Sequence, residues 1–284
     1  MRAGVVQICV GDLPVENVAP VLAAVRQALA GGAGFVLTPE ATNCIATDRP
    51  HQHAVLTDED GDPVLAALRN EAARAGVWIL AGSVIVKTGD ADGRFANRSL
   101  LIDPLGAITA RYDKIHLFDV QVTETETFRE SSAIRPGDRA VVAQTPFAML
   151  GLTICYDIRF AHLYRDLAQA GAQVLTVPAA FSPVTGAAHW HSLLRARAIE
   201  TGCYVLAPAQ TGTHPNTTGT RARQTYGHAL IVAPWGEVLA DAGTEPGVIF
   251  ADLDLQAVES ARARVPALTH DRRYHPPEAP HAVD

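Results

Sequence analysis

Apolar residues along this chain fall into two patterns, short unbroken runs and longer stretches at helical spacing. Residues 3–9 and 35–37 are almost entirely apolar, as buried strands are. Between them, residues 16–30 carry apolar side chains every three or four positions and end at two glycines, which predicts a helix. Strand, helix and strand at this distance indicate a β-α-β unit.

The alternation of strands and helices continues to the end of the chain. Polar stretches without periodicity predict loops at 41–62, 114–137 and 210–225. Strand-like runs outnumber those of a simple doubly wound sheet, and several neighbours are joined by hairpin turns, so we expect a mixed sheet or two packed sheets covered by helices. The remaining predicted helices are 63–75, 161–170, 187–201 and 255–265, and the remaining predicted strands are 77–87, 94–102, 107–112, 140–145, 149–154, 174–177, 204–209, 228–232, 237–240 and 248–253.

Composition narrows the class of protein. A formal charge of −7 over 284 residues argues against nucleic-acid binding, which favours clustered basic residues. Apolar runs stay well short of the roughly 20 residues that a membrane helix needs. The first residues read as a strand rather than a signal peptide. We therefore expect a cytoplasmic protein with neither nucleic acid nor membrane as a partner.

The four cysteines lie far apart without a C-x-x-C pair, so a disulfide framework or zinc ribbon is not indicated. Cys9 and Cys203 lie in apolar runs and are expected in the core, whereas Cys44 has no clear setting. Cys155 alone follows a buried strand at the point where polar residues begin. A thiol at the carboxyl end of a strand can be activated as a nucleophile.

Two other reactive residues also follow apolar runs, Glu40 and Lys114. A cysteine nucleophile needs a base for its proton, and a glutamate can serve if burial raises its pKa. Positive charge stabilises the oxyanion that forms on attack. Lys114 is suited to that role, with the backbone N–H of Tyr156 as a second donor.

The sequence around these residues resembles the nitrilase, or carbon–nitrogen hydrolase, superfamily, whose members use a Glu-Lys-Cys triad. The resemblance rests on three ordered stretches, 37–40 (Leu-Thr-Pro-Glu), 112–117 (Tyr-Asp-Lys-Ile-His-Leu) and 151–160 (Gly-Leu-Thr-Ile-Cys-Tyr-Asp-Ile-Arg-Phe). It spans nearly the whole chain and assigns the triad to Glu40, Lys114 and Cys155.

Several consequences are implied by this resemblance. The fold is an α-β-β-α sandwich with two mixed β-sheets flanked by helices, in a single domain over 1–270 followed by an extended tail over 271–284. The reaction is hydrolysis of a non-peptide C–N bond through a cysteine thioester, without metal or organic cofactor. Subunits pair face to face, so a homodimer or larger assembly is expected.

The closest branch is the Nit branch, judged by further stretches at 188–190, 195–200, 203–205, 226–228 and 234–236. It implies that Glu130 is a fourth acid that either orients Lys114 or relays a proton. It also implies that Arg159, Phe181 and Thr185 line the amide substrate. Ala161-His162 and His191 depart from the branch pattern, which leaves the substrate open.

Alternative interpretations remain at this stage. The preferred substrate is a small carboxylate-bearing amide of the deaminated-glutathione type, but ω-amides such as α-ketoglutaramate, N-carbamoyl amino acids and nitriles suit the same triad. A scaffold protein that keeps the fold is a non-enzymatic alternative. Arg159 can bind a substrate carboxylate or simply pair with Asp157. His189 and His191 face different directions on a helix, so they do not predict a metal site.

Overall fold

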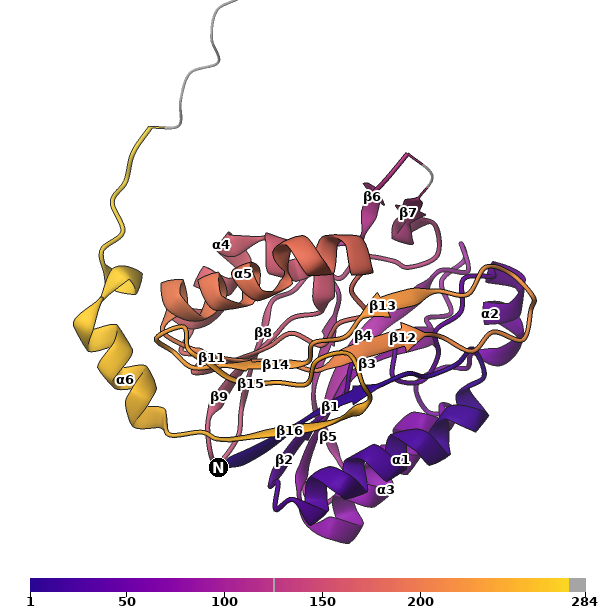
Figure 1. Ribbon diagram of the computed structural model, residues 1–284, viewed down its shortest axis with the longest axis horizontal. Coiled ribbons are helices and arrows are strands. Elements are labelled where there is room, and N and C mark those ends of the chain that lie inside the picture. Colours follow the sequence, from indigo (N-terminus) through magenta and orange to yellow (C-terminus); the bar gives the residue numbers. More distant parts are fainter. Residues whose placement is uncertain (125, 276–284) are drawn as a thin grey trace, which may run out of the picture.

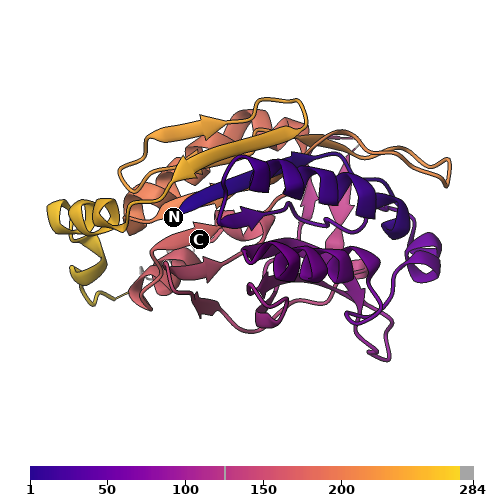
Figure 2. The same cartoon turned by 90° about the horizontal axis from the view of Figure 1, so that it is seen from below.

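Four layers make up the chain, two β-sheets packed face to face with helices on both outer sides (Figures 1 and 2). The computed structural model describes residues 1–124 and 126–275. This arrangement confirms the predicted α-β-β-α sandwich. Within the described residues, none of the helices is long and apolar enough to cross a membrane.

The first sheet places strands from both ends of the chain side by side. Its order is β13-β12-β1-β2-β3-β4-β5, and β16 pairs with β1 as well. The neighbours β1, β2 and β3 are parallel, whereas β3, β4 and β5 form an antiparallel meander. The bounds are β1 (Arg2–Ile8), β2 (Phe35–Leu37), β3 (Trp78–Lys87), β4 (Phe95–Ile102), β5 (Ile108–Asp113), β12 (Ala209–Thr213), β13 (Gln224–Tyr226) and β16 (Gly247–Asp252).

The second sheet has the order β15-β14-β11-β10-β9-β8. Its centre, β9, β10 and β11, is parallel and fully flanked by other strands. A separate short pair, β6 with β7, projects away from both sheets (Figure 1). The bounds are β6 (Asp119–Gln121), β7 (Thr127–Arg129), β8 (Val141–Gln144), β9 (Met149–Leu152), β10 (Val174–Thr176), β11 (Tyr204–Ala207), β14 (Leu230–Val232) and β15 (Val238–Asp241).

Alternation along the strands divides the core into layers. Val5 and Leu37 point between the two sheets, while Val6 and Val36 point toward the outer helices. The helices α1 and α3 cover the first sheet, and α4 and α5 cover the second. The bounds are α1 (Pro14–Ala30), α3 (Pro63–Ala75), α4 (Ala161–Gln169), α5 (Pro183–Thr201) and α6 (Leu255–Arg264).

Three predicted loops contain regular structure, and these predictions were wrong. The stretch 41–62 holds α2 (Arg49–Val55), which buries none of its residues and so lacks apolar periodicity. The stretch 114–137 holds β6, β7 and a 3₁₀ turn, η1 (Glu130–Ser132), and 210–225 holds most of β12 and the start of β13. Helix α5 begins at Pro183 rather than 187, because proline suits a first turn.

The predicted tail over 271–284 is described only in part. Residues 271–275 are exposed and lie outside helices and strands. The remaining residues of the predicted tail, 276–284, lie outside the described residues.

Candidate active site

Cys155 lies on a sharp turn where the second sheet ends and a 3₁₀ helix, η2 (Cys155–Arg159), begins. Its φ of 48° is in the left-handed region, which non-glycine residues adopt only when the surroundings enforce it. The Cys155 N–H donates to the Pro178 carbonyl at 2.9 Å, which ties the turn to the end of β10. The residue is 7% exposed, so its thiol belongs to a largely enclosed site.

Glu40 enters the same site from the first sheet, directly after β2 and Pro39. A Cβ on Gly82 would lie 1.8 Å from the Thr38 carbonyl oxygen, so only glycine lets this segment pass so close to β3. The Glu40 carboxylate accepts the Ala180 N–H at 2.8 Å and lies close enough to Cys155 for its charge to raise the pKa of the thiol. Base and thiol are therefore neighbours in one buried cluster.

Lys114 completes the cluster from the end of β5. Its side chain is 2% exposed, and Nζ donates to Glu40 Oε1 at 2.8 Å. Nζ also contacts both carboxylate oxygens of Glu130 at 2.9 Å. The fold thus brings together the four residues expected to be catalytic, Glu40, Lys114, Cys155 and Glu130, from four separate segments.

Glu130 is held in place by the backbone as well as by the lysine. Its Oε2 accepts the Phe118 N–H at 2.6 Å. Asn97 on β4 donates from Nδ2 to Glu40 Oε1 at 2.9 Å and to Glu130 Oε1 at 3.5 Å. Sequence reasoning missed Asn97, because a single amide in an apolar strand carries no motif. This geometry favours Glu130 as a residue that orients Lys114.

The charge states at rest follow from these contacts. Burial, reinforced by the Glu40 charge, raises the pKa of the Cys155 thiol well above its usual range. Burial acts to raise the pKa of Glu40, but Lys114 and Arg223 bring it below its usual range. Two carboxylates outweigh burial and raise the pKa of Lys114. The resting site is a thiol, a carboxylate and an ammonium, so burial alone does not set the pKa of Glu40.

Asp157 connects the cysteine turn to the lysine segment. It is fully buried, and its Oδ2 accepts the Tyr112 hydroxyl at 2.6 Å and the Ile154 N–H at 2.8 Å. Its Oδ1 accepts the His116 N–H at 3.0 Å and contacts His116 Nδ1 at 2.7 Å. One carboxylate therefore fixes the chain on both sides of Lys114 relative to Cys155. The sequence offered Asp157 only as a partner for Arg159.

Arg159 lies against Tyr156 and Phe181, the residues that follow Cys155 and Ala180 in the chain. The guanidinium of Arg159 lies 5.9 Å from the Tyr156 ring centroid and 5.6 Å from that of Phe181. Its NH2 contacts His189 Nδ1 at 3.2 Å rather than Asp157. Thr185, by contrast, bonds to the Ser182 carbonyl in the first turn of α5 at 3.5 Å. A substrate contact for Thr185 remains a prediction.

The loop that carries Arg223 contributes to the site from a distant part of the chain. Arg223 donates to the Ala180 carbonyl at 2.8 Å, and its charge lowers the pKa of Glu40. Sequence reasoning missed Arg223, because an arginine in an otherwise polar, aperiodic stretch carries no signal that separates a site residue from solvated surface charge.

A two-sheet sandwich with a buried thiol, carboxylate and ammonium at its strand ends has the features of a hydrolase that attacks with cysteine. A profile of the carbon–nitrogen hydrolase family matches residues 2–263. The deaminated glutathione amidase of Yersinia enterocolitica is 38% identical over 272 residues, covering 95% of this chain and 93% of the relative.

Solved structures agree with the sequence relatives. The C. elegans NitFhit protein superposes with a TM-score of 0.86 at 33% identity, covering 95% of this chain, which spans 65% of that protein's length. A mutant amidase from Nesterenkonia sp. AN1, with acrylamide added at its active site cysteine, gives a TM-score of 0.74 at 26% identity, covering 93% of this chain and 98% of its own.

The chain belongs to the carbon–nitrogen hydrolase family. This finding confirms the family inferred from the three motifs and the Nit branch inferred from the further stretches between residues 188 and 236. It also confirms that the chain is an enzyme and that its reaction is hydrolysis of an amide C–N bond.

Proposed function

We propose that this enzyme hydrolyses the amide of a small carboxylate-bearing substrate, of the deaminated-glutathione type, through a thioester on Cys155. The observation that carries the proposal is the buried ion pair of Glu40 with Lys114, with the Cys155 thiol close enough for both charges to act on it. The relatives named deaminated glutathione amidase support the substrate class.

In the first half of the reaction the Cys155 sulfur attacks the amide carbon while Glu40 takes the thiol proton. The resulting tetrahedral intermediate collapses as the C–N bond breaks. Glu40 returns the proton to the departing nitrogen. Ammonia departs, and the acyl group remains on Cys155 as a thioester. Because the resting thiol holds its proton tightly, proton transfer is coupled to attack on a bound substrate.

In the second half Glu40 takes a proton from water, which attacks the thioester carbon. The C–S bond breaks, Cys155 recovers its proton from Glu40, and the carboxylic acid product leaves. One water is consumed for each amide, so atoms and protons balance. Glu40 acts as base and as acid in turn. It can do so because it lies between Lys114, Cys155 and the Ala180 N–H.

Lys114 and the Tyr156 N–H hold the oxyanion in both tetrahedral intermediates. Tyr156 lies in the first turn of η2, where backbone N–H groups lack partners within the helix. Glu130 accepts hydrogen bonds from the Lys114 ammonium at both carboxylate oxygens and so holds the ammonium in position. Loss of one oxyanion donor costs about 3 kcal/mol of barrier, or about 10²–10³ in rate.

A carboxylate on the substrate suits Arg159, which stands between two aromatic rings. A guanidinium binds a carboxylate through two parallel hydrogen bonds. The competing substrates are α-ketoglutaramate, N-carbamoyl amino acids and simple nitriles. Ammonia release from a panel of these three classes and the deaminated-glutathione amide ranks them, and turnover of nitriles at or above that of the deaminated-glutathione amide would overturn our choice.

The decisive experiment replaces the nucleophile. Cys155→Ala and Cys155→Ser should lose ammonia release entirely, whereas the matched control Cys9→Ser should retain it, because the Cys9 thiol contacts Thr213 and His214 rather than the Glu40–Lys114 cluster. Mass spectrometry of the wild type quenched during turnover should show an acyl adduct on Cys155. Normal activity in either Cys155 variant refutes the mechanism, whereas a wild type that releases no ammonia from any substrate of the panel favours a scaffold role.

The same proposal includes expectations about the cellular location and the assembly of the enzyme. We expect a cytoplasmic enzyme that acts as a homodimer or larger assembly, with a small-molecule amide as its partner. Light scattering coupled to size-exclusion chromatography of the full chain tests the assembly, and a monomer at micromolar concentration would contradict it.

A further inference from the structure

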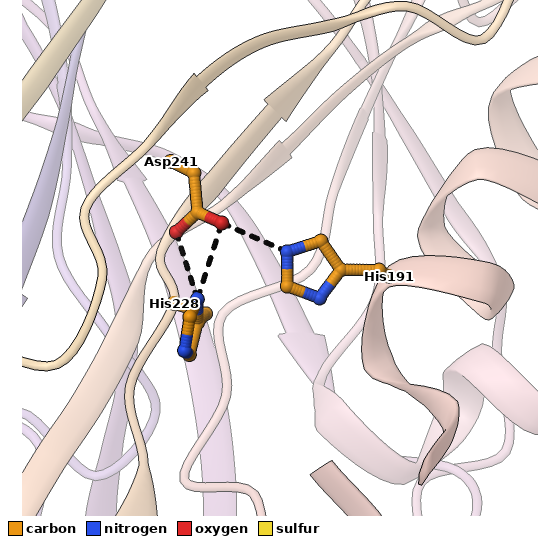
Figure 3. A group of neighbouring side chains, drawn as sticks. All are labelled: His191, His228 and Asp241. Carbon is orange, nitrogen blue, oxygen red and sulfur yellow. Dashed lines mark hydrogen bonds and ion pairs between the residues drawn. The ribbon is translucent and has the colours of Figure 1, made fainter. Parts of the chain in front are cut away.

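Three side chains that sequence reasoning left unconnected meet on the outer side of the second sheet (Figure 3). His191 comes from α5, His228 precedes β14, and Asp241 ends β15. His191 Nε2 lies 2.8 Å from Asp241 Oδ2. His228 Nδ1 lies 2.9 Å from Oδ1 and 3.1 Å from Oδ2 of the same carboxylate.

We propose that His191, His228 and Asp241 bind one divalent transition-metal ion, with Zn²⁺ as the best-suited ion. Two imidazole nitrogens and one carboxylate oxygen form a ligand set of zinc, whereas calcium and magnesium prefer oxygen ligands alone. This site is separate from the Glu40–Lys114–Cys155 cluster and does not depend on the proposed function.

The spacing of the ligand atoms fits such an ion. Bonds of about 2.0–2.2 Å in a tetrahedral arrangement place neighbouring ligand atoms roughly 3.3–3.5 Å apart. The three ligand atoms lie within 4.8 Å of one another, and Asp241 Oδ2 lies 2.8 Å from His191 Nε2 and 3.1 Å from His228 Nδ1. To admit the ion, the His-to-Asp separations must widen by about 0.5 Å and the His-to-His separation must close by at most about 1.5 Å.

The backbone around the ligands is held independently of any ion. His228 has a φ of 54°, donates its N–H to the Gly243 carbonyl at 2.7 Å and accepts the Trp190 indole N–H at 2.8 Å. The Gly243 N–H donates to Asp241 Oδ1 at 2.8 Å. Ligands fixed by such second contacts lose little freedom when an ion binds.

The site is also open enough to receive an ion. The side chains of His191, His228 and Asp241 are 36%, 23% and 31% exposed, so water can occupy a fourth position. On binding, the ring nitrogens of His191 and His228 that face Asp241 coordinate the metal through their lone pairs, and any proton on those nitrogens moves to the other ring nitrogen or is released to water. The carboxylate exchanges its contacts with the two imidazoles for the metal bond.

The competing interpretation is a His-Asp-His hydrogen-bond network that binds no ion. It is tested by titrating EDTA-treated full-length protein with Zn²⁺ against a chromophoric chelator. The variants are His191→Ala and Asp241→Asn, and the matched control is His189→Ala, which lies on the same helix but faces Arg159. Thermal melting in EDTA verifies that every variant is folded.

We expect one tight Zn²⁺ per chain in the wild type and in His189→Ala, with affinity at least tenfold weaker in both site variants. Co²⁺ in place of Zn²⁺ should give visible absorption without a thiolate charge-transfer band, which excludes binding by a cysteine. Affinity unchanged by His191→Ala and Asp241→Asn, or absence of stoichiometric binding in the wild type, would overturn the proposal.

Discussion

Replacement of Glu40 by glutamine is the sharpest test of the catalytic cluster. The glutamate oxygens accept hydrogen bonds on two sides, from Lys114 and Asn97 at Oε1 and from the Ala180 N–H at Oε2. Glutamine has only one acceptor oxygen, so its NH₂ group must face a donor on one side. The glutamine oxygen should accept the hydrogen bonds from Lys114 and Asn97. Its NH₂ group then faces the Ala180 N–H and the Cys155 thiol.

The size of the effect follows from what is lost. Glu40→Gln removes the acceptor for the thiol proton and leaves Lys114 with only Glu130 as a charged partner. General base catalysis contributes about 10²–10⁴ in rate, which corresponds to about 3–5 kcal/mol of barrier at 25 °C. We therefore expect kcat/KM to fall by at least about a hundredfold, with the loss mainly in kcat because Glu40 acts on the reacting atoms.

Ammonia release from the deaminated-glutathione amide measures this directly. Glu259→Gln, an exposed acid on α6, makes the same chemical change away from the site and should be neutral. Thermal melting establishes that Glu40→Gln is folded. A folded Glu40→Gln protein with kcat/KM within threefold of the wild type would refute Glu40 as the base.

Four further outcomes are expected. Asp157→Asn should lower both activity and the free energy of unfolding in urea, the latter by about 3 kcal/mol, because it breaks a buried charged network; a loss below about 0.5 kcal/mol contradicts this role. Glu130→Gln should lower kcat about tenfold at nearly constant KM, and a change confined to KM argues against orientation of Lys114. Arg159→Ala should raise KM for carboxylate-bearing amides more than for neutral ones, and an equal rise refutes the carboxylate contact. Burial lowers the pKa of His214 to about 4, whereas the same side chain in the unfolded chain binds a proton below about pH 6.5. The free energy of unfolding should therefore fall by about 3 kcal/mol in total as pH falls from 6.5 toward 4. Urea unfolding across this window measures the fall, and His214→Gln should not show it.

The elements that were predicted well are those with a strong local signal. The turn between β4 and β5, the β14–β15 hairpin and helix α3 with its proline start and Gly76 end were all readable along the chain. Helix α2 was not, because it buries no side chain and its only strong signal is the Asp48 cap. Local patterns report burial, and an element without burial leaves none.

The sequence by itself determined the family, the alternation of strands and helices, and the three residues that follow strand ends, because motif order and apolar periodicity are properties of the chain. Only the tertiary structure decided that Glu40 stays ionised, that Asn97 and Arg223 face it, and that Asp157 joins the lysine and cysteine segments. The same holds for His191, His228 and Asp241. Charge states and contacts between remote segments depend on burial and distance in space, which no local pattern encodes.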